Sequence, residues 1–126
     1  MSNILVREIT DKDIWDSFVT SQDFYTFLHS FAWGEFHKLE GEKIVRIGFY
    51  DKKELVGVTL FVIVTARRGR FLFCPHGPLL SWNNKNLVDL FFKTAREIAQ
   101  KEHCWFIRIS PIVTTIHQSI FTRHSY

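Results

Sequence analysis

The segment KIVRIGFYDKKELVGVTLFVIVTA, residues 43–66, holds two runs rich in β-branched side chains, joined by the polar turn DKKE. Side chains of residues 43–50 are expected to point to alternate faces of a strand. One face would carry Val45, Ile47 and Phe49, and the other would carry Ile44, Arg46, Gly48 and Tyr50. Residues 55–66 are apolar on both sides, which is typical of a central strand. The segment therefore predicts an antiparallel hairpin at the centre of a sheet.

Further strands extend this hairpin. Residues 3–8 predict a strand before it, and FLFC, residues 71–74, continues it into a three-stranded meander after the turn ARRGR. The prolines and glycine of CPHGPLL end that third strand. CWFIRIS, residues 104–110, predicts the last strand of the sheet.

Three helices are expected around these strands. Thr10, with Asp13 three residues later, has the form of a helix N-cap and capping box. Ser30 is suited to cap a second helix, which we expect to end at Gly41. Residues 84–102 form the clearest helix, because their apolar side chains recur at helical spacing. Its stripe consists of Leu87, Leu90, Phe91, Ala95, Ile98 and Ala99.

This order of elements predicts an α/β fold. It runs strand, two helices, three-stranded meander, helix and strand, so we expect a mixed sheet with flanking helices, the last of which covers one face. No repeat or linker divides residues 1–126, which we take as one unit. Residues 111–126 are interpreted as weak helix or loop.

Composition limits the class of protein more than its activity. The 126 residues are 46% hydrophobic and 23% charged, which is ordinary for a globular domain. The formal charge of +3 suits an anionic ligand such as a nucleotide, phosphate or RNA, and equally a solubilising surface. Cys74 and Cys104 lie in apolar contexts, which favours two buried thiols in a reducing compartment. The early acidic residues and the short apolar runs predict a cytoplasmic protein without signal peptide or transmembrane segment.

Conventional catalytic motifs are missing from the sequence. It has no phosphate-cradling glycine-rich loop, no nucleophile elbow and no metal-spaced set of cysteines and histidines. RRGR, residues 67–70, leads into a strand and not into a helix N-terminus, so it does not fit a coenzyme A site. We therefore assign no catalytic residue, metal or cofactor from the sequence.

A series of short motifs resembles the Fem-type (FemAB and FemX-like) peptidoglycan-bridge aminoacyltransferases, in their N-terminal part. The motifs are FLHSFAWGEFHKLEGEKIVRIGFYD, LVGVTLFVI, RGRFLFCPHGPLL and FIRISP. That family typically shows a serine-aromatic-x-Trp-Gly segment, then Arg-Ile-Gly, Leu-Val-Gly, Gly-Pro and Arg-Ile-x-Pro. The matches follow the family's order from about residue 27 to residue 111.

The resemblance implies a fold and an activity. Members consist of two lobes, each similar to the acyl-CoA N-acyltransferase fold, and take an amino acid from aminoacyl-tRNA. They attach it to the stem-peptide amine of a peptidoglycan precursor carried on a nucleotide or a lipid, in bacterial cell-wall synthesis. An amine attacking an activated ester needs alignment and oxyanion stabilisation but no enzyme nucleophile.

The resemblance also suggests substrate-binding residues on the second helix. Ser30, Trp33 and Gly34 fall on the family's Trp-Gly segment, and Lys38 follows four residues after Gly34 on the same helical side. A lysine near this helix is associated in the family with the phosphates of the precursor, so Lys38 is the first candidate. Trp33 also has the spacing of a core residue. A helical glycine costs about 1 kcal/mol, which close approach of another backbone or a ligand at Gly34 would offset.

Three positions in the later motifs bear on whether this part of the chain binds substrate. Arg108 on the last strand is a further candidate for the cleft, with an ion pair at the edge of the core as the alternative. His76 stands where the family often has arginine before Gly-Pro, and Ser110 stands where it often has an acid. These departures argue against substrate binding by the two loops.

The length of the chain sets the final expectations. Residues 1–126 correspond to a single partial lobe, with the second lobe absent, and the resemblance places the precursor between lobes. We expect half a cleft, little transfer by the chain alone, and a second-lobe protein or another copy as partner. The alternatives are a non-catalytic binding or oligomerisation module and, third, a coenzyme A-dependent N-acyltransferase.

Overall fold

A computed structural model describes residues 4–22, 25, 29–67 and 69–110 of the chain. The elements of this part, in chain order, are β1 (Ile4–Glu8), α1 (Lys12–Thr20), α2 (Phe31–Leu39), β2 (Lys43–Asp51), β3 (Glu54–Ala66), β4 (Gly69–Cys74), β5 (Leu79–Leu80), α3 (Lys85–Lys101) and β6 (Phe106–Ile109). The strand expected at residues 3–8 is present as β1. The weak helix or loop expected at 111–126 lies outside the described residues.

The strands form one mixed sheet with β3 at its centre. The order is β1-β2-β3-β4-β6, and the short β5 pairs with the part of β3 that β4 leaves open. All pairs are antiparallel except β4 with β6, which are parallel and are connected along the chain through β5 and α3. The predicted hairpin, meander and mixed sheet are confirmed, whereas the two-residue β5 was not predicted.

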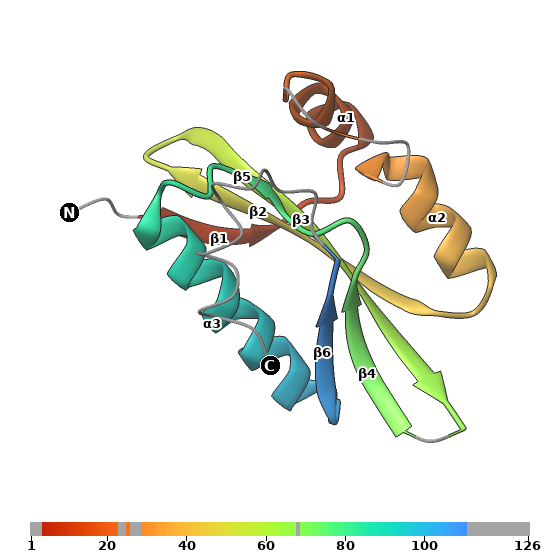
Figure 1. Cartoon of the computed structure of the whole chain (residues 1–126). Coiled ribbons are helices and arrows are strands. Elements are labelled where there is room, and N and C mark those ends of the chain that lie inside the picture. The colour runs from red at the N-terminus through yellow and green to blue at the C-terminus, as the bar shows by residue number, and fades with distance from the viewer. Residues whose placement is uncertain (1–3, 23–24, 26–28, 68, 111–126) are drawn as a thin grey trace.

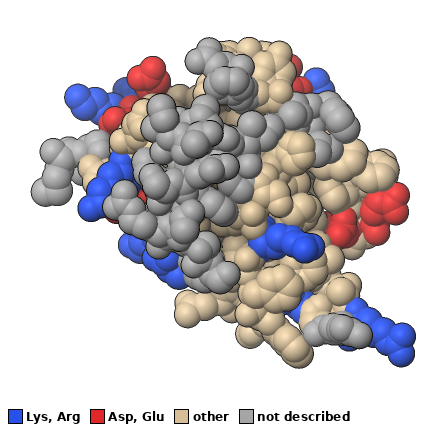
Figure 2. Space-filling model, viewed as in Figure 1, with Lys and Arg blue, Asp and Glu red and all other residues tan. Residues whose placement is uncertain are grey.

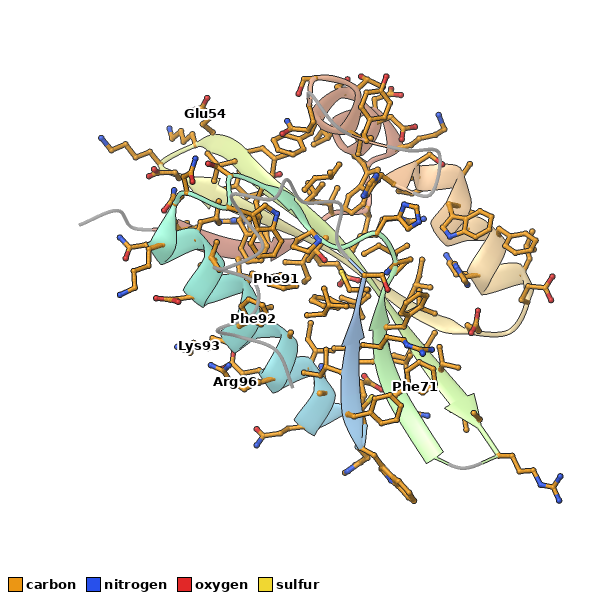
Figure 3. The ribbon with its side chains drawn as sticks, in the orientation of Figure 1. Glu54, Phe71, Phe91, Phe92, Lys93 and Arg96 are labelled. Atoms are coloured by element: carbon orange, nitrogen blue, oxygen red, sulfur yellow. The ribbon has the colours of Figure 1, made fainter. Side chains whose placement is uncertain are left out.

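Helix α3 covers one face of the sheet, and α1 and α2 lie on the other (Figure 1). Its apolar stripe packs on the sheet, while Lys93 and Arg96 point away from it (Figure 3). Burial of each large side chain in such a stripe contributes about 1.5–3 kcal/mol. Leu87, Phe91 and Ala95 of the predicted stripe are fully buried, and so are Val88 and Phe92, which the prediction did not include.

The face under α1 and α2 has its own smaller core. Trp15 and Val19 of α1 pack on it together with Ile9, Val58, Leu60, Val62 and Leu79. The Trp15 Nε1–H donates to the carbonyl oxygen of His29 at 2.7 Å, so this buried indole is satisfied at the entry to α2. The two helices are thereby fixed on the same face.

The helix boundaries confirm two predictions and correct one. Ser30 caps α2, since its Oγ accepts the Trp33 N–H at 3.2 Å, and Gly41 follows the helix with a φ of 87°. The prediction of Thr10 as the cap of α1 is wrong. Asp11 is the N-cap, because its Oδ1 accepts the backbone N–H groups of Asp13 and Ile14 at 2.8 and 3.1 Å.

The described residues contain no helix that is both long and apolar enough to span a bilayer.

Candidate functional site

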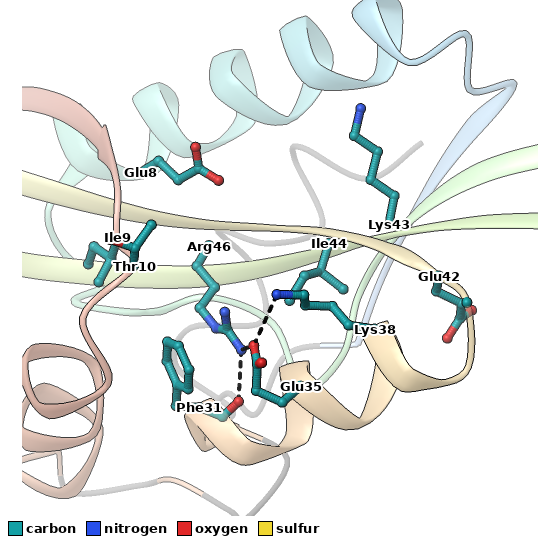
Figure 4. Close-up of a pocket in the computed structure, with 11 residues that line it drawn as sticks. Glu8, Ile9, Thr10, Phe31, Glu35, Lys38, Glu42, Lys43, Ile44 and Arg46 are labelled. Carbon is teal, nitrogen blue, oxygen red and sulfur yellow. Dashed lines mark hydrogen bonds and ion pairs between the residues drawn. The ribbon is translucent and has the colours of Figure 1, made fainter.

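A pocket of about 630 Å³ opens between α2, the start of β2 and the connection from β1 to α1 (Figure 4). Acidic and basic side chains are equally represented in its lining, so its potential depends on how they pair. It is lined by Glu8, Ile9, Thr10, Phe31, Glu35, Lys38, Gly41, Glu42, Lys43, Ile44 and Arg46.

Arg46 forms the buried part of this pocket, with a side chain that is only 7% exposed. The alternation of β2 points it toward α2, where its Nη2 donates to the Phe31 carbonyl at 2.8 Å and to Glu35 Oε2 at 2.9 Å. Its guanidinium carbon lies 3.5 Å from the centre of the Phe31 ring. These contacts offset the cost of removing the charge from water and tie the first turn of α2 to the sheet.

Gly34 makes room for this arginine. A Cβ at position 34 would lie 2.5 Å from Arg46 Nη2, closer than nonbonded atoms approach, and 3.1 Å from Cζ, which is also a tight contact. The close approach expected at this glycine is therefore present. Its partner is the side chain of Arg46, where the sequence suggested a backbone or a ligand.

Lys38 stands at the open side of the pocket and is 56% exposed. Its Nζ lies 3.7 Å from Glu35 Oε2, the same oxygen that accepts from Arg46 (Figure 4). The hydrogen bond from Arg46, followed by the charges of Arg46 and Lys38, holds the pKa of Glu35 below its ordinary value despite partial burial. A single carboxylate thus lies between two cations, one buried and one mobile.

The other charged groups of the lining are partly engaged elsewhere. Lys43 points away from Arg46 (Figure 4), and its Nζ donates to Glu102 Oε2 at 2.7 Å. Glu42 Oε1 lies 2.6 Å from His37 Nδ1. Lys38 is therefore the lining cation with the most freedom to reach a ligand, and Arg46 supports it from behind.

The remaining predicted site residues lie outside the pocket. Trp33 is half-buried in the smaller core and stacks on Phe36 at a centroid distance of 5.1 Å. Arg108 is exposed on β6 and has no ion pair or hydrogen bond with another residue of the described part. Lys38 and Gly34 are brought together with Arg46, whereas Trp33 and Arg108 are not.

Glu35 and Arg46 are the pocket residues that the sequence reasoning missed. A signal for Arg46 was available, because it is the one charged residue in the interior of an otherwise apolar β2. Glu35 lies three residues before Lys38, a spacing that places both on one helix face. The contact with Gly34, however, depends on how α2 is placed over β2, which no local pattern encodes.

The two cysteines and the possible metal ligands of the described residues were the other candidates for chemistry. Cys74 is fully buried beside Thr59, with Oγ1 and Sγ 3.0 Å apart, and burial raises its pKa to about 12. Cys104 is only half-buried, so the prediction of two buried thiols holds for Cys74 alone. Residues 4–22, 25, 29–67 and 69–110 contain no group of three or more His, Cys, Asp or Glu placed to hold a metal ion.

Comparison with known proteins decides the family. The sequence profile of the FemAB family matches residues 9–124, nearly the whole chain. The chain belongs to the FemAB family. The aminoacyltransferase FemA of Staphylococcus epidermidis is 22% identical to it over 104 residues, which are 74% of this chain and 25% of FemA.

Solved structures show the same fold. A crystal structure of FemX superimposes with a TM-score of 0.82 at 24% identity, covering 95% of this FemAB-family chain and 30% of FemX. The aminoglycoside acetyltransferase AAC(6')-Iy, solved with a bisubstrate analogue of coenzyme A, gives a TM-score of 0.68 at 12% identity. A ribosomal-protein-alanine N-acetyltransferase from Brucella melitensis gives 0.67. These matches confirm the N-acyltransferase-like fold.

The extent of the matches differs between the two groups of relatives. This FemAB-family chain spans about a quarter of FemA and 30% of FemX, but its fold covers 91% of AAC(6')-Iy. The chain therefore spans less than a third of the length of these FemAB-type relatives and most of the length of AAC(6')-Iy.

Proposed function

We propose that this chain is the N-terminal part of an aminoacyltransferase that acts in peptidoglycan-bridge synthesis. It would transfer an amino acid from aminoacyl-tRNA to the stem-peptide amine of a cytoplasmic peptidoglycan precursor. The observation that carries the proposal is the FemAB match over residues 9–124. The FemX-like fold and the similarity to a protein named aminoacyltransferase FemA support it.

The proposed reaction makes modest demands on the residues of this chain. The amine forms a C–N bond with the aminoacyl carbonyl, the ester C–O bond to the tRNA ribose breaks, and the amine's proton ends on the released ribose oxygen. Alignment and oxyanion stabilisation are needed, but no covalent enzyme intermediate. An inert, fully buried Cys74 is compatible with this chemistry.

The pocket on α2 is proposed to hold the phosphates of the precursor. Nucleotide-linked and lipid-linked muramyl peptides both carry a diphosphate, for which Lys38 offers a mobile charge and Arg46 a buried one. Glu35 reduces the repulsion between the two cations, because its Oε2 lies near both, and its negative charge lowers the affinity of the pocket for any anion. We expect weak binding by this chain alone, with a second lobe completing the cleft.

Calorimetric titration with a UDP-linked muramyl pentapeptide tests this site. Lys38→Ala is expected to weaken binding about tenfold, which corresponds to loss of one charge-assisted contact. The matched control is Lys12→Ala, which removes another exposed helix lysine, 63% exposed and paired with Asp16 at 3.1 Å. Equal precursor affinities for Lys38→Ala and Lys12→Ala would show that Lys38 does not contact the precursor.

A transfer assay tests the activity itself. Charged tRNA and precursor are incubated with the chain alone and with a second-lobe protein, and we expect appreciable transfer only with both parts. Lack of transfer in the combined reaction would contradict the proposed function. Heat on titration with acetyl-CoA would instead favour a coenzyme A-dependent N-acyltransferase, which the AAC(6')-Iy fold match makes worth measuring.

A further inference from the structure

The pocket beside α2 lies where the described residues leave one edge of the sheet unpaired. Strand β1 pairs with β2 only as far as Glu8, which lies opposite Ile47. Residues 43–46 of β2 extend past the end of β1, while their other edge pairs with β3. Three of these four residues line the pocket, so the pocket occupies the place that a longer β1 would fill.

Ile44 directs its backbone N–H and carbonyl to this unpaired edge. In an antiparallel ladder, successive residues direct their backbone groups to opposite neighbours. The carbonyl of Arg46 accepts the Ile9 N–H at 2.9 Å from the β1 side, so the backbone groups of Ile44, two residues earlier, point to the same side. No strand of the described residues pairs with Ile44 there. Both groups are therefore open to a ligand in the pocket that this residue lines.

The two sides of the unpaired edge carry different charges. Arg46 and Lys38 lie on the α2 side (Figure 4). Glu8 lies on the other side, because its register partner Ile47 packs in the core under α3. A strand added along the edge would present alternate side chains to these two sides. One side would therefore meet cations, and the other would meet a carboxylate.

Arg46 and Glu8 both retain unused binding capacity. The Nε of Arg46 is buried and has no hydrogen bond within the described residues, in a side chain that is 7% exposed. Glu8 is exposed and has no hydrogen bond or ion pair with another described residue. The other lining carboxylates, Glu35 and Glu42, already have an arginine and a histidine as partners. Glu8 is thus the lining carboxylate that is available to an ammonium group.

The surroundings of the edge favour a short peptide over a second copy of this chain. Charged side chains are a common protection of sheet edges against pairing with one another. Glu40 and Glu42 flank Gly41 in the turn before β2, and Figure 2 shows acidic atoms gathered at this end of α2. The unpaired stretch, residues 43–46, is about 13 Å long, which matches an extended segment of about four residues.

An anionic ligand with an extended peptide and an amine matches all three features of the pocket. Strand addition takes its affinity from backbone groups at an edge and its specificity from the side chains on either side. The acceptor of the proposed reaction carries a diphosphate, a peptide main chain and a side-chain amine. The cations near α2 suit the diphosphate, the backbone of Ile44 suits the peptide, and Glu8 suits the amine.

We propose that the unpaired edge of β2 binds the stem peptide of the acceptor as an added strand. The peptide is hydrogen-bonded to the backbone of Ile44, and its side-chain ammonium group lies beside Glu8. This inference rests on the proposed function and assigns the peptide part of the precursor to a site of its own.

Amide hydrogen exchange of the full chain, followed by NMR, tests the backbone contact. In the free chain the Ile44 N–H should exchange fast, whereas the Val45 N–H, directed to β3, should exchange slowly. Saturation with a UDP-linked muramyl pentapeptide is expected to slow exchange at Ile44 about tenfold or more, as one added hydrogen bond would. UDP-N-acetylmuramic acid, which lacks the peptide, should leave Ile44 unchanged.

Two substitutions at position 44 separate the backbone from the side chain. Ile44→Pro removes the N–H, and proline is tolerated in an edge strand where that group faces away from the sheet. Ile44→Ala shortens the side chain and keeps the N–H. Calorimetric affinity for the pentapeptide precursor should be about tenfold lower for Ile44→Pro than for Ile44→Ala, and affinity for UDP-N-acetylmuramic acid should be equal. Urea unfolding checks both folds, and the exchange experiment decides alone if the proline variant does not fold.

Glu8→Gln tests the contact with the amine. It is expected to weaken binding of the pentapeptide precursor about threefold, as loss of an exposed ion pair would, and to leave binding of the amine-acetylated precursor unchanged. The matched control is Glu54→Gln, which removes the same charge at the exposed start of β3. Equal affinities of the two variants for the pentapeptide precursor would contradict the placement of the amine.

Three results would overturn the inference. These are unchanged exchange at Ile44 when the pentapeptide precursor binds, equal precursor affinity of Ile44→Pro and Ile44→Ala, or slow exchange at Ile44 in the free chain, which would mean that the edge is already paired. Protection of Ile44 without transfer in the combined assay would contradict the proposed function and leave this site standing. Transfer with unchanged exchange at Ile44 would do the reverse.

Discussion

At the scale of single residues, Gly34 and Arg46 act as a pair. The guanidinium fills the space that a Cβ would need, and its bonds to Phe31 and Glu35 hold it there. An exposed arginine could swing aside from a methyl group, but this one is 7% exposed and packed against a ring. The pair therefore fixes both the position of α2 and the floor of the pocket.

Gly34→Ala is expected to destabilise the fold by up to about 2 kcal/mol. Alanine gains about 1 kcal/mol of helix propensity, but forcing a buried group to move costs about 1–3 kcal/mol. Urea unfolding measures the difference. In an Arg46→Met background the same substitution should become neutral or stabilising, and an unchanged cost there would mean that Arg46 is not its cause.

The sequence pointed to two residues at or beside the pocket. Lys38, which lines it, was named through the family resemblance of its segment, and Gly34 because a glycine within a helix costs stability that a close contact would offset. The Arg46–Glu35 pair was missed, since its partners come from a helix and a strand whose packing is tertiary. The cap at Asp11 was missed because Thr10 and Asp11 are adjacent and both have side chains that can cap a helix.

At the scale of elements, Glu102 joins the end of α3 to two strands. Its carboxylate accepts from Lys43 at the start of β2 and from Arg70 at the start of β4, and its carbonyl accepts from Arg70 as well. The side chain is 10% exposed, so these bonds are largely shielded from water. The hydrogen bond from Lys43, and then the other cationic contacts, lowers the pKa of Glu102 despite its burial.

Glu102→Gln is expected to lower the free energy of unfolding at pH 7 by about 1–3 kcal/mol. Because the folded pKa of Glu102 is lowered, its contribution is complete above the unfolded value of about 4.3 and is lost as pH falls toward the folded pKa. Unfolding by urea should therefore show a steeper loss of stability below about pH 5 in the wild type than in the variant. Glu97→Gln, at an exposed position of the same helix, is the control; parallel pH profiles for wild type and Glu102→Gln would contradict the prediction.

The elements themselves were largely predictable. Strongly β-branched runs gave β2 and β3, and helical spacing gave α3 within one residue at each end. The two-residue β5 was missed because pairing with β3, and not its own composition, makes it a strand. The parallel pairing of β6 follows from the crossover through α3, which strand composition does not report.

At the scale of the whole molecule, the sheet separates two faces with different chemistry. The α3 side is a closed apolar core that contains Cys74, and the other side carries the pocket beside α2. A reagent can reach the Cys74 thiol, at the centre of this core, only when α3 separates from the sheet. Cys104, between α3 and β6, lies closer to the surface.

Thiol labelling with a disulfide reagent is expected to modify Cys104 but not Cys74 in the native protein. Burial and a pKa of about 12 keep the Cys74 thiol protonated and out of contact with the reagent. Burial also raises the pKa of Cys104, but that side chain is only half-buried and can meet the reagent. In denaturant both should react. Peptide mass spectrometry identifies the modified residue, and rapid native labelling of Cys74 would show that α3 does not seal this face.

The parallel β4–β6 pair has a consequence for the order in which the molecule forms. The meander β2–β3–β4 closes through short turns, whereas β6 reaches β4 only after the whole of α3 has been traversed. We expect β6, a four-residue strand that pairs only with β4 within the described residues, to join late and to detach early in hydrogen exchange. Arg46 and β2 remain with the meander at that stage, while Trp105, Phe106 and Arg108 leave with β6.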